Sequence, residues 1–405
     1  MTDPLSICMV TTFYPPLHFG GDAAYAYQLT NALARRGHAV TVVHSADAYR
    51  ALGGKHAGDF AHAPGVTVRR LQTRVPTASA LGTYLSGRPL AYASQLQDVL
   101  EGGAFDVIHF HNVSLAGGPG VLGYGDAVKL YTTSEHWLVC PMHVLFRYNR
   151  EPCVEPHCLR CTFAFRRPPQ LWRYTGLLER SVKHVDLFLS PSRFTLQAHR
   201  DRGFTAPMRH LPYFYSDEAR ERTDDSDGHQ TKPYFLYVGR LERLKGVHVL
   251  LDVFHDYRDA NLLIVGEGSE EDELRRNAAG LEHIRFLGRL HPSQLAPLYE
   301  NAVALLVPSI GFEVFGIVAL EAFARKTPVI AHDLGALSEV IDDSGGGLLY
   351  RSPAKLRAAM ETLLADSEQR RALGELGHDA WQRLWSEDVH IADYYEAIDE
   401  ARALR

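Results

Sequence analysis

Two carboxylates eight positions apart, Glu313 and Glu321, follow an apolar run at residues 302–307. The run predicts a buried strand, and a turn rich in Pro, Ser and Gly connects it to a helix that begins near Gly316. Glu313 would then lie in the loop at the carboxyl end of the strand, where open α/β sheets bind ligands, and Glu321 would lie on the helix. Taken alone, the pair could be the acid and base of a hydrolase. The alternative is that neither glutamate has a function, one being exposed to solvent on the helix and the other lying in the loop.

Two cations, Arg240 and Lys245, form a second candidate group. A predicted strand at 234–239 ends at Arg240, and Lys245 leads through Gly246 into a predicted helix at 247–257. Arginine offers a planar fork and lysine a point charge, which together suit a diphosphate. Cations are unfavourable at a helix N-terminus unless an anion lies between them. We therefore expect an anionic ligand here, with exposed basic residues that bind nothing as the alternative.

The first half of the chain places polar residues at the ends of predicted strands. Gly20 and Gly21 separate a strand at 5–12 from a helix at 22–36, where glycines allow a close backbone approach and the helix amides favour an anion. A strand that ends at His111 and a strand at 129–133 that leads to His136 would deliver side chains to the same sheet edge. The alternatives are that the glycines are needed only for steric reasons in the turn and that the histidines are hydrogen-bonded core residues.

Four of the five cysteines lie close together, with the spacing Cys140-x12-Cys153-x4-Cys158-x2-Cys161. In a cytosolic protein such a cluster indicates metal binding or redox chemistry rather than a disulfide framework. Thiolates at this spacing predict a structural tetrahedral zinc site. An iron–sulfur cluster, a pair of disulfides or reduced cysteines without a ligand are the alternatives.

The residues around this cysteine-rich insert are basic. From residue 140 to 210 the sequence has 12 Lys or Arg against 5 Asp or Glu, with aromatic residues between them. Such a stretch could contact an anionic acceptor or a membrane surface. The alternative is that these basic residues form a solvent-exposed surface around a metal site.

Length and composition indicate an ordinary globular protein of two or three domains. The chain has 405 residues, of which 46% are hydrophobic and 22% charged. Its formal net charge of −6 argues against a nucleic-acid binder. No apolar run approaches the roughly 18 residues of a membrane span. The N-terminus lacks the basic region of a signal peptide, so we expect a cytoplasmic location.

Strand and helix patterns alternate through both halves, which predicts two doubly wound parallel sheets. Residues 213–232 are mostly polar and predict a linker. We therefore expect a first domain at 1–212 that carries the insert at 140–161, and a second domain at 233–385. The end of the chain is predicted to be helical, in pieces at 355–383 and 388–404.

The chain resembles the family-4 retaining glycosyltransferases of GT-B architecture. The resemblance rests on two doubly wound halves, a polar hinge, Gly-Arg-x4-Lys-Gly at 239–246, Glu-x7-Glu at 313–321 and a helical tail. The resemblance covers nearly the whole chain and is strongest over 234–341. It implies two Rossmann-like domains facing a central cleft, with the final helix, about 386–405, packed on the first domain. It also implies transfer of a sugar from a nucleoside-diphosphate sugar to an acceptor hydroxyl, in the biosynthesis of a glycan, polysaccharide or glycoconjugate.

The resemblance also implies roles for single residues. Arg240 and Lys245 would hold the diphosphate, Glu321 the ribose hydroxyls and Glu313 the hydroxyls of the donor sugar. The remaining positions would be a histidine near the anomeric centre, His136, and backbone contacts to the donor at Gly20, Gly21, Phe315, Gly316 and Ile317. No catalytic metal is expected, since no Asp-x-Asp motif demands one, and front-face attack by the acceptor is favoured over a covalent intermediate on Glu313.

The chain departs from the usual pattern in its cysteine-rich insert and in its hinge, which has Leu211-Pro-Tyr-Phe-Tyr where a Pro-Asn-Gly turn is usual. Both departures concern the acceptor side, so the acceptor stays open; a lipid-linked acceptor and a peripheral contact at the inner face of the membrane would suit the basic stretch. The alternatives are a phosphorylase or nucleotide-sugar epimerase of the same fold, or a catalytically silent protein whose cysteines bind a metal or a partner.

Overall fold

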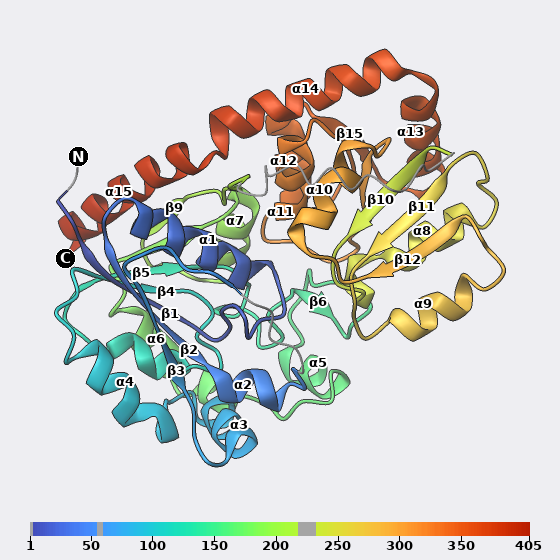
Figure 1. Cartoon of the computed structure of the whole chain (residues 1–405). Coiled ribbons are helices and arrows are strands. Elements are labelled where there is room, and N and C mark those ends of the chain that lie inside the picture. The colour runs from blue at the N-terminus through green and yellow to red at the C-terminus, as the bar shows by residue number, and fades with distance from the viewer. Residues whose placement is uncertain (1–2, 55–59, 218–231) are drawn as a thin grey trace. The chain divides into compact units, whose positions relative to one another are not determined.

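A computed structural model describes residues 3–54, 60–217 and 232–405 of the chain (Figure 1). The chain forms two compact units. The first unit comprises Met1–Val144, His157–Tyr213 and His390–Arg405, and the second comprises Leu145–Pro156 and Phe214–Val389. Most of the linker predicted at 213–232 lies outside the described residues.

In the part of the first unit that the structure describes, seven parallel strands form one sheet in the order β3-β2-β1-β4-β5-β8-β9. The strands are β1 (Ser6–Thr11), β2 (Ala39–Ser45), β3 (Val66–Leu71), β4 (Val107–Phe110), β5 (Val128–Thr132), β8 (Leu187–Ser190) and β9 (Met208–His210). Strands β4, β5 and β8 are buried throughout. They are mostly apolar on both faces, as expected for a parallel sheet covered on both sides.

The helices of the first unit follow its strands in the usual alternation. They are α1 (Gly21–Arg35), α2 (Ala46–Ala51), α3 (Pro76–Ser86), α4 (Ala93–Leu100), α5 (Cys158–Ala164), α6 (Leu177–Val182), α7 (Arg193–Arg200) and most of α15 (Glu387–Leu404), with short 3-10 turns η1 (Leu90–Tyr92), η2 (Pro119–Gly123) and η3 (Leu171–Tyr174). The last helix is fixed to this unit by buried hydrogen bonds: the hydroxyl of Tyr394 lies 3.0 Å from Nδ1 of His109, and Nε2 of His390 lies 3.0 Å from the hydroxyl of Tyr25.

The second unit has its own parallel sheet, in which six described strands follow the order β12-β11-β10-β13-β14-β15. They are β10 (Tyr234–Val238), β11 (Asn261–Val265), β12 (Ile284–Gly288), β13 (Leu305–Val307), β14 (Val329–His332) and β15 (Gly347–Tyr350). A two-stranded antiparallel pair, β6 (Phe146–Arg147) and β7 (Glu151–Pro152), also belongs to this unit.

The helices of the second unit are α8 (Val247–Phe254), α9 (Glu271–Asn277), α10 (Pro292–Glu300), α11 (Ile317–Ala324), α12 (Ala336–Ser344), α13 (Pro353–Ala365) and α14 (Ser367–Leu384), with a 3-10 turn η4 (Arg243–Lys245). The helix predicted at 355–383 is therefore two helices. Asp366 separates them because its carboxylate accepts the amides of Glu368 and Gln369, at 3.0 and 2.8 Å, and so caps the start of α14.

The predicted fold class, doubly wound parallel sheets in both halves, is confirmed. The strand order reverses between β1 and β4 in the first unit and between β10 and β13 in the second. At such a switch point the loops at the carboxyl ends of the two strands diverge and leave room for a ligand. In the described parts of the chain, no helix combines the length and the apolar character needed to cross a bilayer.

Candidate functional site

The switch point of the second unit brings the two predicted groups together. The loop that follows β10 carries Arg240 and Lys245, and the loop that follows β13 carries Glu313. The backbone joins the two loops, because the amides of Ile310 and Gly311 both donate to the carbonyl of Leu244, at 2.9 and 3.0 Å. Groups that are 68 positions apart in sequence thus share one site.

Lys245 and Glu313 form an ion pair in this site. The Nζ atom of Lys245 lies 2.6 and 2.8 Å from the two carboxylate oxygens of Glu313, and the side chains are 22% and 14% exposed. The hydroxyl of Ser309 donates to the same carboxylate at 2.6 Å, and Nδ1 of His332, at the end of β14, lies 2.8 Å from the carbonyl of Ser309. Sequence analysis identified the two charged residues but neither their pairing nor the support from Ser309.

The ion pair sets the charge state of Glu313. Burial by itself would raise the pKa of this carboxyl, but the ammonium of Lys245, the hydrogen bond from Ser309 and the positive charge of Arg240 outweigh burial, and the pKa is lowered. Glu313 is therefore a carboxylate near neutral pH and can accept hydrogen bonds from hydroxyl groups of a ligand.

Arg240 is the cation of this site that is most available to a ligand. Its position is fixed through the backbone, since the hydroxyl of Tyr237 donates to its carbonyl at 2.8 Å. Its side chain is exposed, and no ion pair is found for it among the residues that the structure describes. The guanidinium of Arg240 is exposed, and the charge of Lys245 is only partly neutralised by Glu313. The loop therefore keeps positive charge that can bind an anion.

The loop between β10 and α8 depends on one glycine. Gly246 precedes α8 with φ at 72°, and a Cβ atom at this position would lie 2.0 Å from the carbonyl oxygen of Pro308. Only glycine allows the cation loop to approach the β13 loop this closely. In the first turn of α8 the amide of Val249 donates to the carbonyl of Gly246 at 2.9 Å, which leaves the amides before it for a ligand.

The second loop delivers backbone groups from the start of α11. Phe315 is buried, with its ring centroid 6.1 Å from that of Trp385, and this contact anchors the loop. Gly316 has φ at 114°, where the chain turns into α11 at Ile317. In the first turn of α11 the amide of Ala319 donates to the carbonyl of Gly316 at 2.9 Å, and the amides before it are suited to bind an anionic or polar ligand group.

Glu321 lies on α11 and is held by a tyrosine that sequence analysis did not identify. The hydroxyl of Tyr299, near the end of α10, donates to Oε2 of Glu321 at 2.7 Å. Burial raises the pKa of Glu321 above its ordinary value, although the hydrogen bond from Tyr299 and the charge of Arg325 oppose the shift. Burial and the neighbouring Glu321 raise the pKa of Tyr299 well above its ordinary value, so the phenol stays a donor.

The first unit holds the other predicted residues, Gly20, Gly21 and His136. Gly21 is the first residue of α1, and Gly20 precedes it in an extended conformation with φ at −164°. Since any residue can adopt that conformation, the turn itself does not require glycine at position 20. The lack of a side chain there keeps the start of a 15-residue helix accessible.

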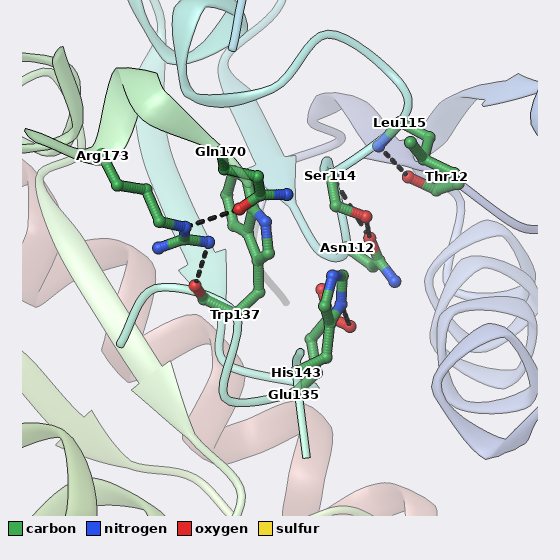
Figure 2. Close-up of polar contacts among 9 residues, drawn as sticks. All are labelled: Thr12, Asn112, Ser114, Leu115, Glu135, Trp137, His143, Gln170 and Arg173. Carbon is green, nitrogen blue, oxygen red and sulfur yellow. Dashed lines mark hydrogen bonds and ion pairs between the residues drawn. The ribbon is translucent and has the colours of Figure 1, made fainter. Parts of the chain in front are cut away.

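The loops after β1 and β4 are joined at the switch point of the first unit (Figure 2). The amide of Thr12 donates to the carbonyl of Asn112, and the hydroxyl of Thr12 accepts from the amide of Leu115 at 3.1 Å. The side chain of Asn112 accepts from the amide and the hydroxyl of Ser114, at 3.1 and 2.7 Å. These bonds fix the loop that follows His111.

His136 follows β5 and is buried, as is His111 after β4. Neither ring nitrogen of either histidine has a hydrogen-bond partner among the described residues. Burial lowers the pKa of His136 well below its ordinary value, and that of His111 to about 3, so both rings are neutral. Unpartnered buried nitrogens at strand ends are costly and suit a site that a polar ligand completes. His109, by contrast, is a hydrogen-bonded core residue.

The segment after His136 is held by charged contacts (Figure 2). Glu135 forms an ion pair with His143. The guanidinium of Arg173 donates to the carbonyl of Trp137 at 2.7 Å and to the side chain of Gln170 at 2.6 Å. The contacts among these residues were not predicted from the sequence, and they position the loop that carries His136.

The predicted zinc site is not supported by the structure. Within the described residues, no three or more His, Cys, Asp or Glu side chains are placed to hold a metal ion. Cys140, Cys158 and Cys161 belong to the first unit, whereas Cys153 follows β7 and belongs to the second. Cys158 and Cys161 lie on the helix α5, and Cys153 follows the β6–β7 pair. The five cysteines also form no disulfide with one another.

Comparison with protein families gives two matches that together span most of the chain. A model described as Glycosyltransferase Family 4 matches residues 19–215, and a model described as Glycosyl transferases group 1 matches residues 219–379. The second match contains both strands of the second unit's switch point, β10 and β13, and the first match begins after β1.

Two curated relatives align with parts of the chain. A phosphatidyl-myo-inositol mannosyltransferase of Mycobacterium leprae is 42% identical over 160 residues, which cover 37% of this chain and 42% of the relative. A D-inositol 3-phosphate glycosyltransferase of Corynebacterium kroppenstedtii is 35% identical over 202 residues, which cover 45% of this chain and 44% of the relative. The chain thus aligns with less than half the length of either relative.

Solved structures match over nearly the full chain. A sucrose-phosphate synthase from Thermosynechococcus elongatus has a TM-score of 0.74 at 21% identity, covering 99% of this chain and 100% of that one. The Anabaena protein HepE, in complex with UDP and glucose, has a TM-score of 0.68 at 17% identity, covering 98% and 99%. At this identity the likeness establishes the fold.

Proposed function

Since the chain belongs to the glycosyltransferases of family 4 with the GT-B fold, we propose that it moves a sugar from a nucleoside-diphosphate sugar to an acceptor hydroxyl, with retention of configuration. The observation that carries this proposal is the convergence of Arg240, Lys245 and Glu313 at the switch point of the second unit. Such a donor requires two cations that bind its diphosphate and a carboxylate that binds its hydroxyl groups.

The chemical problem is the departure of the nucleoside diphosphate, which gains negative charge as the bond to the anomeric carbon breaks. Arg240, Lys245 and the first amides of α8 and α11 would stabilise that charge, because preorganised donors need little reorganisation during the reaction. Glu313 neutralises part of the charge of Lys245 in their ion pair. When the sugar hydroxyls donate to Glu313, the ammonium can turn its remaining donors toward the phosphates.

Glu313 is better suited to binding than to attack. It accepts hydrogen bonds from both Lys245 and Ser309, which lower the nucleophilicity of its oxygens. We therefore favour front-face attack by the acceptor hydroxyl, whose proton passes to the departing phosphate. His136, neutral and without a partner in the described part of its unit, would orient the sugar from the first unit, and Gly20 and Gly21 would let the donor approach the start of α1.

Glu321 would bind the ribose hydroxyls, and Tyr299 would keep it oriented. The ionised carboxylate accepts hydrogen bonds from hydroxyl groups more strongly than the neutral acid does, so nucleotide affinity should fall as Glu321 takes up a proton at low pH. We expect Tyr299→Phe to raise the pKa of Glu321 further, because burial is then opposed only by Arg325. The loss of UDP, GDP or ADP affinity on acidification should therefore begin at a higher pH in the variant than in the wild type.

The test of this role is the dissociation constant of the nucleotide, measured in both proteins from about pH 8 down to about pH 4, close to the ordinary pKa of a glutamate. Tyr234→Phe is a matched control: this tyrosine also donates one hydrogen bond, at 2.9 Å, but to the carbonyl of Leu298 rather than to the carboxylate. Superimposable pH profiles for the wild type and Tyr299→Phe would show that Tyr299 does not act through Glu321.

For the acceptor we propose a hydroxyl carried on a lipid-linked molecule. By its name, one of the relatives acts on phosphatidyl-myo-inositol, and the stretch at 140–210 of this chain is basic. A lipid-linked acceptor would place the reaction at the inner face of a membrane.

The reaction itself is tested by product analysis with UDP-, GDP- and ADP-sugars, each with and without lipid acceptors. We expect release of the nucleoside diphosphate that depends on the acceptor, and a new glycosidic bond with the anomeric configuration of the donor in its NMR coupling constant. Conversion of the donor without any acceptor would indicate an epimerase, and a reaction that needs inorganic phosphate would indicate a phosphorylase. An inverted product would contradict retention.

A further inference from the structure

Helix α3 of the first unit exposes an apolar stripe. Val75, Leu81 and Leu85 are 59%, 46% and 44% exposed, and with the exposed Ala78 they follow the three- and four-residue spacing of one helix face. The opposite face is buried, and α3 packs against α2 (Figure 1). Single exposed leucines are common, but a continuous stripe on an uncharged helix is not.

Neighbouring segments extend this stripe into a patch. The side chain of Leu90, which is exposed, lies beside Gly82 of α3. The turn η3 adjoins the same helix, because the indole of Trp172 donates to the carbonyl of Tyr84 at 2.9 Å, and η3 exposes two more large side chains. We call this set the α3 surface; it consists of Val75, Leu81, Leu85, Leu90, Leu171 and Tyr174.

The two segments that carry the α3 surface are basic, and acidic side chains follow them on the neighbouring helices at Asp98 and Glu179. Residues 60–97 contain four arginines and no Asp or Glu, and residues 160–178 contain another four and again no Asp or Glu. The two segments meet where the hydroxyl of Tyr84 donates to the carbonyl of Pro168 at 3.0 Å. Arg74 and Arg88, on either side of α3, are exposed, and no ion pair involves them in the described residues.

We propose that the α3 surface docks on an anionic lipid bilayer. Leucine side chains on an uncharged helix can enter the boundary between headgroups and acyl chains, and flanking arginines can extend to the lipid phosphates while their apolar stems stay on the surface. A second copy of the chain is a poorer match, because two identical surfaces would bring their arginines together without any acidic residue between them. This docking concerns binding alone and is independent of the donor chemistry.

The experiment is flotation of the full chain with vesicles of phosphatidylcholine that contain phosphatidylglycerol, compared with phosphatidylcholine alone. We expect the wild type to bind the anionic vesicles at least about tenfold more strongly and to lose binding as salt is raised. Leu81→Glu with Leu85→Glu should weaken binding by about a hundredfold or more, since it removes two apolar anchors and adds repulsion. Arg74→Gln with Arg88→Gln should weaken it about fivefold for each arginine.

Leu376→Glu is the matched control, because this leucine is 51% exposed on α14 of the second unit and should leave vesicle binding unchanged. Thermal melts check that each variant folds. The proposal is overturned if the wild type does not bind anionic vesicles, or if the double glutamate variant binds them with the same affinity as the wild type. It is also overturned if light scattering shows a wild-type dimer that this variant dissociates, since a second copy would then cover the surface. Transfer activity does not enter this readout, so failure here leaves the proposed reaction untouched.

Discussion

Replacing Lys245 with alanine is expected to lower kcat/KM for sugar transfer by a factor of about 100 to 1,000, as loss of one preorganised donor to a developing anion typically does. Lys245 pairs with Glu313 at 2.6 Å and would bind the leaving diphosphate during transfer. Near-normal transfer by Lys245→Ala would refute its assigned role. Lys355→Ala, an exposed lysine of the same unit, should retain full activity.

The same substitution leaves the carboxylate of Glu313 without its main partner, at an expected cost of about 3 kcal/mol in stability. Because the folded-state pKa of Glu313 is lowered, the contribution of the pair is present above the ordinary pKa of a glutamate and is lost as the pH falls through the lowered value. The stability difference between wild type and Lys245→Ala should therefore shrink in acid. Adding Glu313→Gln should recover stability near neutral pH but not transfer, which separates catalysis from folding.

The substitution Gly246→Ala should have the largest effect on stability, about 3–5 kcal/mol. Its φ of 72° is unfavourable for alanine, and the new Cβ would lie 2.0 Å from the carbonyl oxygen of Pro308, which is backbone and cannot rotate away. To relieve the clash, the cation loop must move away from the β13 loop, so transfer should fall with stability. Chemical denaturation and steady-state kinetics measure the two effects.

Gly280→Ala separates backbone strain from this clash. Gly280 has a similar φ of 81°, but a Cβ there would meet nothing within 4 Å. We expect a loss of only about 1 kcal/mol and unchanged transfer. If Gly246→Ala and Gly280→Ala lower the free energy of unfolding by the same amount, the close approach of the two loops is not the reason that position 246 requires glycine.

The fold class, and the strand-end loops that carry Arg240, Lys245 and Glu313, could be predicted from the sequence because both rest on local patterns. Apolar runs such as 234–239 predict parallel strands, and each is followed by a helix with its own start signal. The helix predicted to begin near Gly316 begins at Ile317. Strand β13 is shorter than predicted and begins at Leu305 rather than Ala302, because its pairing with the neighbouring strand β14 starts only at Leu305, opposite Val329.

Other parts depend on tertiary contacts that spacing does not encode. Helix α3 was not predicted, because its stripe of leucines faces solvent and its interior includes Gly82, so no core-facing periodicity marks it. The partners of the two glutamates, Ser309 and Tyr299, carry no motif that links them to these carboxylates. The cysteine spacing likewise does not reveal that Cys153 belongs to the second unit and the other three cysteines to the first, and the zinc site stays a prediction.

The measurement that bears most directly on the donor site is calorimetric titration of UDP, GDP and ADP into the wild type and into Arg240→Ala with Lys245→Ala. If these two cations hold the diphosphate, at least one nucleotide should bind the wild type with one-to-one stoichiometry, and the double variant should bind it at least about a hundredfold more weakly. Equal affinity of the two proteins for that nucleotide would contradict the assignment.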